Sequence, residues 1–527
     1  MSSVFRAALQ AAQPIDDGGR TWLFVAYDQL NDQLGPLATL DPADAGIVLV
    51  ESLEKSQRRP YHQRKLALVL ANLRHFAVEQ AQRGVAVHHV VTEGGYAEAL
   101  RAVARERGPL RMMRAAEREL RDELQPLVDT GLLLVEDHTG WLTTAADFAR
   151  AGGPEGPWRM DGFYRAVRQR TGWLMDTDGH PFGGKYSHDA DNRKRWPGDP
   201  PEPLPPRFEA SDIKAEVVAL VRQRFAHHPG EVHAEELPAT AADAAMLWSW
   251  ALGSCLHHFG PFEDAMSASH RRLFHTKVSE LLNLHRLRPQ QLVDDVLAHD
   301  ELPLSSREGF LRQVAGWREF VRHVHEATDG FRRLTDDGTP TPNALQSHEP
   351  LPDVFWGAPS GLACLDGVVA DVWRDGWSHH IPRLMVLSNL ATLLDVSPRE
   401  LTDWFWVAYA DAYDWVVEPN VLGMGTFAAG DVMTTKPYVS GANYLHKMSD
   451  YCAGCAFHPK KTCPITPMYW AFLNRKRPFL EGNRRMNLPL ASAARRSDAQ
   501  RQEDRARTQQ VLRALRDGRV LSPDDDP

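Results

Sequence analysis

Several features that would place a chain of 527 residues in a familiar class are missing or scarce. No run of apolar residues approaches the roughly 18 that a membrane helix needs, so we expect no contact with a membrane. Residues 1–19 have no basic stretch followed by a long apolar run, so we expect a short polar tail there rather than a secretion signal. The five cysteines are too few and too unevenly placed for a disulfide framework, which favours a reducing, cytoplasmic location.

Basic residues are also fewer than acidic ones, with 60 lysines and arginines against 69 aspartates and glutamates. The net charge of −9 argues against a general nucleic-acid binder, because nonspecific affinity comes from neutralising phosphates. A local basic surface on an acidic protein is still compatible with this charge. Hydrophobic residues make up 43% and charged residues 24%, which is an ordinary globular composition, and the length predicts more than one domain.

Residues 21–150 alternate short apolar runs with helical patterns. Leu66, Val69, Leu73 and Phe76 recur at helical spacing, and Gly84 stands where the chain leaves that helix. Strand, helix, strand at this rhythm predicts a Rossmann-like domain with a parallel sheet. It contains no G-x-G-x-x-G turn, so a dinucleotide site of the usual kind is not supported. The predicted strands are Trp22–Ala26, Ile47–Val50, Val85–Val91, Leu110–Met113 and Leu132–Val135.

The rest of the chain divides into three parts by composition. Residues 151–235 shift to glycine, proline and charge, which predicts an interdomain connection on the surface. Residues 236–495 are helical in pattern and rich in tryptophan and histidine, which predicts an all-α domain. Residues 496–527 predict a charged, solvated helical tail.

Four of the five cysteines form the sharpest motif, namely Cys364, Cys452, Cys455 and Cys463. Cys452 and Cys455 have the C-x-x-C spacing that lets two thiolates face one metal centre, and Cys463 follows after a short loop. Four thiolates suit either zinc or a four-iron four-sulfur cluster, and spacing alone does not separate them. Buried cysteines without a ligand are the plainer alternative. Cys255, in an apolar helical stretch, is interpreted as a core residue.

The order of several short motifs makes the chain resemble the iron–sulfur bacterial cryptochromes and photolyases, and among them the bacterial (6-4) photolyases. The motifs are Asp28-Gln-Leu30, Gly316-Trp-Arg-Glu319, His379-His-Ile-Pro-Arg-Leu-Met385, Tyr409-Ala-Asp-Ala-Tyr413, Pro419-Asn-Val-Leu-Gly-Met424 and Met448-Ser-Asp-Tyr-Cys452. The resemblance implies an N-terminal antenna domain, a C-terminal FAD domain and a 4Fe-4S cluster held by Cys364, Cys452, Cys455 and Cys463.

The resemblance also implies which residues bind FAD. The segment His275-Thr-Lys-Val-Ser279 matches the stretch that wraps the flavin's phosphates, and it offers hydroxyls, backbone donors and one cation to a dianion. A helix start capped by Thr276 would use the same residues. The full implied set is His275, Thr276, Lys277, Val278, Ser279, Gln313, Trp317, Arg318, Arg383 and Asp411.

The adjacent histidines His379 and His380 are the implied catalytic residues. A histidine pair on a helix is more often a surface or hydrogen-bonded core feature. Relatives that repair (6-4) photoproducts place such a pair here, three residues before the arginine that contacts the flavin. That repair needs a proton delivered to the lesion, which an imidazole with a near-neutral pKa can supply. We expect His380 to be the proton donor.

Further implied sites are less complete. Trp356 and Trp404 match residues that photoreduce the flavin in relatives, although large aromatic residues are more often simply core. Phe405 replaces the usual tyrosine beside the second tryptophan. Asp264 matches a carboxylate near a divalent ion, such as Mg²⁺, at the DNA site. Glu54 matches one of two residues that hold a 6,7-dimethyl-8-ribityllumazine antenna in relatives, but the other position is occupied by polar residues.

These matches predict a monomeric DNA photolyase that uses blue light to repair the (6-4) photoproduct in UV-damaged DNA. The alternative is a blue-light photoreceptor without repair, which Phe405 and Val417 favour slightly. A zinc-stabilised helical nucleic-acid binder without flavin is the third reading. For DNA contact we expect two basic triplets, Arg193–Arg195 and Arg475–Arg477, although a charge run is more often a solvated face.

Overall fold

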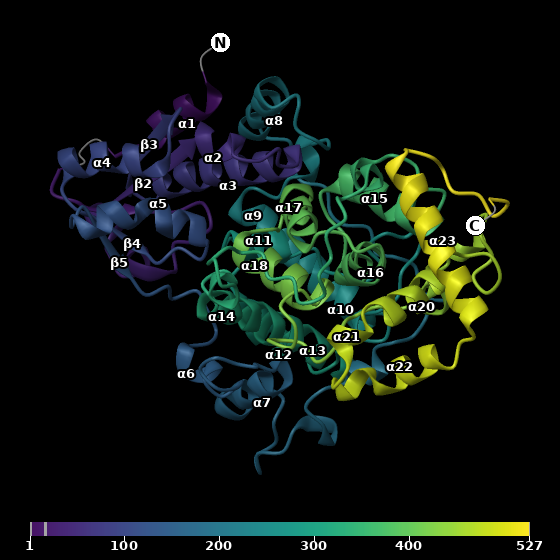
Figure 1. Cartoon of the computed structure of the whole chain (residues 1–527). Helices are drawn as coiled ribbons and strands as arrows, with labels where there is room; N and C mark the ends of the chain where they lie inside the picture. Colours follow the sequence, from purple (N-terminus) through teal and green to yellow (C-terminus); the bar gives the residue numbers. More distant parts are fainter. Residues whose placement is uncertain (1–2, 15–17, 526–527) are drawn as a thin grey trace.

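The computed structural model describes residues 3–14 and 18–525. Its N-terminal part contains a five-stranded, fully parallel sheet in the order β3-β2-β1-β4-β5 (Figure 1). The strands are β1 Thr21–Phe24, β2 Ala45–Ser52, β3 Ala86–Thr92, β4 Leu110–Met113 and β5 Leu133–Glu136. Each predicted apolar run overlaps one strand, and the predicted Rossmann-like fold is confirmed.

The order of the strands dictates where the helices lie. Helix α3 (Gln63–Gln82) connects β2 to β3, whereas α4 (Tyr96–Arg107) and α5 (Arg118–Asp129) follow β3 and β4 in the opposite direction across the sheet. Because such crossovers are right-handed, α3 covers one face and α4 and α5 cover the other. After α3, Gly84 adopts a φ of 93°, which a side chain would oppose. The strand order reverses between β1 and β4, where ligand crevices of such sheets open.

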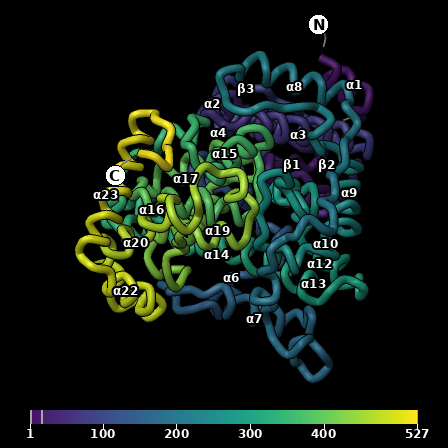
Figure 2. Tube along the Cα trace, turned by 90° about the vertical axis from the view of Figure 1, so that its right-hand side faces the viewer, coloured from purple at the N-terminus to yellow at the C-terminus, as the bar shows by residue number. Residues whose placement is uncertain are grey.

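The N-terminal segment differs from the polar tail expected. Residues Val4–Ala12 form helix α1, which is capped by Ser3 and buries Phe5 and Leu9. Its neighbours are α3 and α8 (Asp212–Arg224), which run beside it in both views (Figures 1 and 2). Phe5 and Leu9 are four residues apart and therefore share one face, a pattern too short to separate from a polar stretch by composition.

The region 151–235 is more than a surface connection. Helix α7 (Met160–Thr171) buries Phe163 and Val167 against the helical domain, and α8 buries Val217 and Val221 against α1 and α3. Each pair is spaced by four residues, as expected for one face of a helix. Proline-rich residues 197–206 contain no helix or strand.

The C-terminal part is helical and holds the second core. Four π-helical segments lie in its described residues, at Ala251–Cys255, Arg312–Arg318, Pro382–Ser388 and Pro419–Gly425. Such segments shift the side chains that follow and often lie at functional sites. Helices over this part are α9 Ala241–Trp250, α10 Leu256–Phe259, α11 Ser279–Asn283, α12 Pro289–Ala298, α13 Leu304–Leu311, α14 Glu319–Ala327, α15 Ala363–Asp375, α16 Asn389–Leu393, α17 Pro398–Ala408, α18 Asp414–Glu418, α19 Ala442–Met448, α20 Ile465–Arg475, α21 Arg477–Leu480 and α22 Asn487–Ala494.

The chain's last helix, α23 (Asp498–Arg516), is only partly solvated. It buries Asp504, Thr508, Val511 and Leu515 and packs along α20 (Figures 1 and 2). These residues lie three or four positions apart, so they form one stripe on a helix whose other faces are charged. Among the described residues, no helix is long and apolar enough to cross a membrane.

Helix α3 joins the N-terminal domain to the helical domain at the end of α17 and the loop that follows it. The backbone N–H of His62 donates to the carbonyl of Val407 at 2.9 Å, and the Lys65 ammonium donates to the carbonyls of Trp406 and Ala412. Arg64 forms a buried ion pair with Glu280 at 2.9 Å. Because both charges are buried, removing one partner would be costly, and the joint is therefore well defined.

Candidate active site

A cavity inside the helical domain has a volume of about 300 Å³, within the range of small-molecule sites. All ten residues expected to bind FAD line it, as do His379 and His380. The lining residues come from α11 and the turn before it and from the loop between α17 and α18. Others come from the π-helical segments Arg312–Arg318, Pro382–Ser388 and Pro419–Gly425. The tertiary structure thus brings together segments that are distant in the chain, such as those of His275 and Asp411.

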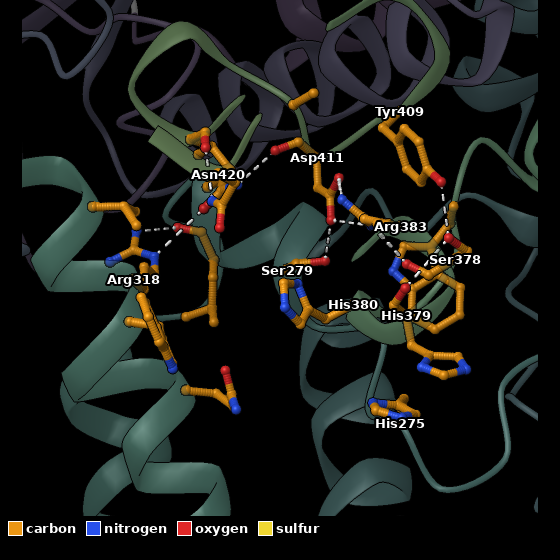
Figure 3. A pocket seen from close by; sticks show the side chains of 18 of the residues that line it. His275, Ser279, Arg318, Ser378, His379, His380, Arg383, Tyr409, Asp411 and Asn420 are labelled. Carbon is orange, nitrogen blue, oxygen red and sulfur yellow. Dashed lines mark hydrogen bonds and ion pairs between the residues drawn. The ribbon is translucent and has the colours of Figure 1, made fainter. Parts of the chain in front are cut away.

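A charged cluster organises one wall of the cavity (Figure 3). Arg383 donates to both carboxylate oxygens of Asp411, at 3.0 and 2.9 Å, and the Ser279 hydroxyl donates to the same carboxylate at 2.7 Å. Burial alone would raise the pKa of Asp411, but the Arg383 ion pair and these hydrogen bonds lower it. The pair is therefore charged, and it holds the guanidinium over the cavity in one orientation.

Lys277 brings a positive charge to the lining of the cavity. Its ammonium lies 5.5 Å from the centroid of the Trp377 ring, and no hydrogen bond or ion pair joins it to another described residue. Burial lowers its pKa to about 8. Its φ of 54° belongs to the left-handed region, an uncommon conformation for lysine. A lone cation lining a pocket is suited to an anion such as a diphosphate.

The three histidines of the cavity differ in their surroundings. His379 is buried and stacks on His275, with ring centroids 4.1 Å apart and planes inclined by 15°. His380 forms no side-chain hydrogen bond or ion pair with another described residue, and its exposed surface faces the cavity (Figure 3). Burial lowers the pKa of His380 to about 4 and that of His275 to about 3, so both imidazoles are neutral at pH 7.

Arg318 lies across the cavity from Arg383 (Figure 3). Its guanidinium stands 4.4 Å from the ring centroid of Trp141 and donates to the carbonyl of Leu282 at 3.1 Å. Burial lowers its pKa to about 10, which leaves it protonated. A second cation thus borders a cavity that otherwise presents aromatic and aliphatic side chains.

Glu263 is a lining residue that the sequence did not single out. Its buried carboxylate accepts hydrogen bonds from Asn192, Arg312 and Gln313 at 2.9, 3.1 and 2.5 Å. Burial raises its pKa. The one feature of the sequence that could have indicated Glu263 as a site residue is its position next to Asp264.

Asn420 also lines the cavity, whereas Glu418 does not. Val417 brings an apolar side chain to the cavity, and its neighbour Glu418 forms ion pairs with His325 at 3.0 Å and Arg399 at 2.9 Å. Asn420 belongs to the Pro419–Met424 motif, and this motif was the feature of the sequence that could have indicated Asn420 as a lining residue. Its amide donates to the carbonyl of Val416 at 2.7 Å (Figure 3).

The expected tryptophans Trp356 and Trp404 do not touch each other directly. Trp373, which the sequence did not reveal, lies between them: it stacks on Trp356 with ring centroids 5.5 Å apart and meets Trp404 edge-on at 5.9 Å. Trp404 in turn contacts Phe405 and Tyr409, which line the cavity. No spacing rule connects Trp373 to its neighbours, because they belong to different helices.

The four motif cysteines gather at one end of the helical domain. Cys364 lies at the start of α15, Cys452 and Cys455 lie in and just after a turn, and Cys463 precedes α20. Burial and the nearby thiols of Cys463, Cys455 and Cys452 raise the pKa of Cys364, and burial raises that of Cys463 to about 12. Across the described residues, no group of three or more histidine, cysteine, aspartate or glutamate side chains is placed to hold a metal ion.

Asp264 lies beside the cavity wall that Glu263 forms. It accepts a hydrogen bond from Tyr444 at 3.4 Å and has Arg193 at 3.8 Å, and burial raises its pKa to about 6. The predicted role of Asp264 at a divalent ion stays a prediction.

Glu54 does not face a ligand cavity. Its carboxylate is exposed and pairs with Arg58 at 3.3 Å. A second cavity near the carboxyl edge of β2 measures only about 60 Å³ and is lined by other residues, among them Lys55, Glu117 and Trp406. Because ligand pockets usually measure about 300 Å³ or more, these residues do not fit the lumazine antenna that Glu54 predicted.

The two basic triplets differ in their surroundings. Arg475 and Lys476 bind Asp395 at 2.5 and 2.8 Å, and Lys476 is buried. Arg193 is exposed, pairs with Asp189 and lies 3.8 Å from Asp264. Burial, and then the positive charges of Arg485 and Arg193, lower the pKa of the half-buried Lys436. Arg475 and Lys476 of the second triplet therefore stabilise the fold through Asp395. Arg193 lies near Lys436 and Arg485 on the surface beside the cavity.

Comparison with known proteins agrees with this architecture. A family model described as deoxyribodipyrimidine photo-lyase-related protein matches residues 23–237. A (6-4) photolyase of Agrobacterium fabrum is 31% identical over 510 residues, covering 94% of this chain and 99% of that protein.

Two crystal structures share the fold. A bacterial class III photolyase from Agrobacterium tumefaciens matches with a TM-score of 0.55 and 14% identity, covering 96% of this chain and 99% of that one. A cryptochrome of Synechocystis sp. PCC6803 matches with a TM-score of 0.55 and 13% identity, covering 94% and 98%. At these identities the two structures establish the architecture alone, an N-terminal α/β domain followed by a helical domain.

Proposed function

The chain belongs to the photolyase and cryptochrome family, and from this premise we propose that it repairs the (6-4) pyrimidine photoproduct in UV-damaged DNA under blue light. The family implies FAD, and the residues that line the large cavity fit that group: apolar walls suit its rings, and Lys277, Thr276 and Ser279 suit its diphosphate. The observation that carries the choice of repair is His380, an imidazole that lines the cavity and hydrogen-bonds to no other residue in the described part of the chain.

When bound and reduced, FAD supplies an electron to the lesion on excitation by blue light. The protein's own task is to place the reactants and to move a proton. Arg383, held by Asp411 and Ser279, and Arg318, held over Trp141, present two fixed positive charges to an anionic ligand. Fixed charges of this kind stabilise developing negative charge without having to reorganise.

His380 needs a proton before it can donate one. Burial lowers its pKa to about 4, which makes it neutral at pH 7. A bound diphosphate and the phosphates of flipped-out DNA bring negative charge near the ring, and nearby negative charge raises the pKa of a histidine. We therefore infer that His380 becomes protonated when the substrate binds, and that a ring nitrogen of His380 then donates this proton to the lesion.

We propose that DNA lies on the surface formed by Arg193, Lys194, Arg195, Lys436 and Arg485. Two observations support this surface. Burial, and then the positive charges of Arg485 and Arg193, lower the pKa of Lys436, and Arg193 lies 3.8 Å from Asp264 beside the cavity wall. Like charges held together in this way favour a polyanion such as the DNA backbone.

We further propose that the four motif cysteines bind a 4Fe-4S cluster. Each thiol disfavours ionisation of its neighbours, as the raised pKa of Cys364 reflects, and a cationic centre would relieve that repulsion. Such a centre needs reducing surroundings, so we place the protein in the cytoplasm. The cluster is assigned a structural role, because the repair chemistry does not use it.

A second candidate is a blue-light photoreceptor without repair. It is favoured by Val417, which lines the cavity where relatives place an acidic or amide residue. One assay separates the two candidates. DNA carrying a single (6-4) lesion is incubated with the FAD-loaded protein under blue light and in darkness, and restored thymines are counted. Light-dependent repair supports a photolyase, whereas bound but unrepaired DNA in both conditions supports the photoreceptor.

A further inference from the structure

We propose that three basic residues close the ligand crevice of the N-terminal sheet, so that FAD collects the blue light without a lumazine antenna. The residues are Lys55 on helix α2 (Leu53–Gln57) and Arg58 and Arg59 directly after it. The inference uses the proposed function only in taking FAD as the chromophore. It concerns the capture of light and is independent of which lesion is repaired.

The crevice lies at the carboxyl edge of the sheet, where three helices begin. Helix α2 follows β2, α4 follows β3 and α5 follows β4. The strand order reverses between β1 and β4, and sheets of this kind bind ligands at such a reversal. The cavity of about 60 Å³ lies in this crevice. Because Glu54 belongs to α2, an antenna held by Glu54 would have to enter between these three helices.

Ion pairs tie the end of α2 to α5 across the crevice. The Arg59 guanidinium donates to both carboxylate oxygens of Glu119, at 2.5 and 3.1 Å, a bidentate geometry that fixes its orientation. The Lys55 ammonium donates to Glu117 at 2.8 Å and to Glu119 at 3.3 Å. Burial alone would raise the pKa of Glu119, but its hydrogen bond to Arg59 and the charges of Lys55 and Arg59 lower it to about 2. Glu119 is therefore charged and holds both basic side chains at the crevice.

Arg58 connects the same crevice to α4. Its guanidinium pairs with Glu54 at 3.3 Å and with Glu123 at 3.4 Å. Glu123 in turn accepts a hydrogen bond at 2.5 Å from the backbone N–H of Tyr96, the first residue of α4. A Cβ atom on Gly95 would stand 2.5 Å from the Glu123 carboxylate, so glycine at this position permits the contact. Glu54, which predicted the antenna, is thus engaged by a residue of this chain.

Arg59 also covers the aromatic face that a flat ligand would use. Its guanidinium lies 3.8 Å from the ring centroid of Trp406, which lines the small cavity from the helical domain. A planar guanidinium stacks on an aromatic face much as a planar ring does. Arg59 further donates to the hydroxyl of Tyr61 at 3.3 Å. The contact with Trp406 and the pair with Glu119 hold Arg59 between the two domains.

Tyrosine rings fill the crevice from the side of the sheet. Tyr27 stacks on Tyr413 with ring centroids 6.1 Å apart and contacts Tyr96 at 6.0 Å. The Tyr27 hydroxyl donates to Glu117, so this ring is fixed by a hydrogen bond as well as by packing. The lumazine, a bicyclic ring with a five-carbon chain, needs more room than about 60 Å³.

Admitting such a ring would require Arg59 to leave both Trp406 and Glu119. The side chains of Arg59 and Glu119 are each 22% exposed, so the separated charges would be poorly solvated. Breaking a largely buried pair in this way is costly. The ion pairs therefore act against the ligand rather than for it, and Arg58 and Arg59 determine which molecules the crevice accepts.

The test is a titration of the FAD-loaded full chain with 6,7-dimethyl-8-ribityllumazine. Lumazine fluorescence reports binding, and the excitation spectrum of FAD photoreduction reports energy transfer. We expect no saturable binding to the wild type, whose excitation spectrum should follow FAD absorption alone. Arg58→Ala/Arg59→Ala should gain saturable binding and an added lumazine band. Arg83→Ala is the matched control, because it removes an ion pair with Asp32 beyond the far end of α3 and should resemble the wild type.

Arg59→Ala/Glu119→Ala removes both members of the central pair and leaves neither of these two charges unpaired, so it tests the same point if the first variant is unstable. Melting temperature and FAD content show whether each variant is folded. Saturable binding of lumazine to the wild type would overturn the closed crevice. Folded variants that still exclude lumazine would overturn the role of the arginines. Absence of repair in every sample would contradict the proposed function and leave the titration standing.

Discussion

The His379 ring lies flat against His275, with ring centroids 4.1 Å apart, and this contact separates the roles of two adjacent histidines. His379 is committed to packing, since it is 4% exposed and stacked. His380, the next residue, presents its ring to the cavity. The stack therefore identifies His380 as the member of the pair that can reach a substrate.

His380→Ala should abolish (6-4) repair and leave FAD content and lesion binding nearly unchanged. A residue that acts only in the reaction lowers its rate and spares ground-state binding. His379→Ala is the matched comparison: it removes a buried ring and should lower FAD content and melting temperature together. Repair assays, flavin absorbance and thermal melting measure these effects, and retained repair in His380→Ala would remove it from the mechanism.

The apoprotein should be less stable at pH 5.5 than at pH 7.5. Burial lowers the pKa of His62 to about 4 and that of His323 to about 2, below the unfolded value near 6.5. Between these values the unfolded chain binds more protons, so stability falls as pH falls, by up to about 1.4 kcal/mol per pH unit for each such histidine. Thermal melting across this range checks the sign. His323→Gln should flatten the dependence, and a melting temperature that rises on acidification would contradict it.

Replacing Arg193, Lys194 and Arg195 by glutamine should flatten the salt dependence of DNA binding. The slope of log affinity against log salt should fall by roughly 0.9 for each phosphate that the variant no longer neutralises. Replacing Arg475 and Lys476 is the informative contrast. These residues bind Asp395, so removing them should lower the melting temperature and leave the slope unchanged. Equal slopes in the first variant and the wild type would exclude the proposed DNA surface.

Cys455→Ser should lose iron and inorganic sulfide from anaerobically purified protein, along with much of the soluble yield, because ligation energy at such sites is folding energy. Cys255→Ala is the control. Cys255 is buried in a helix apart from the motif, so its variant should keep iron and FAD. Wild-type protein that contains one zinc and no iron would identify the centre as a zinc site instead.

The sequence alone determined the parallel sheet and the helical domain, and its resemblance to a known family supplied the residues expected to line the cavity. The two domains depend on local order, because apolar runs and helical periods specify strands and helices. The cavity residues were matched instead through short motifs that this chain shares with that family. The same periodicity was present in α1, where Phe5 and Leu9 lie four residues apart, but one such pair is too little to separate a helix from a tail.

The tertiary structure decided which side chains face the site and which are committed elsewhere. His380 and His379 are neighbours in sequence, yet rotation about the helix axis sends one to the cavity and the other to His275. Trp373 joins Trp356 to Trp404 only because three segments meet at the Phe355 carbonyl. Glu418 and Lys476 are bound by distant partners, which no local pattern records. The orientation of a side chain depends on the residue that it contacts. The packing of the whole chain decides which residue that is, and the neighbours in sequence do not.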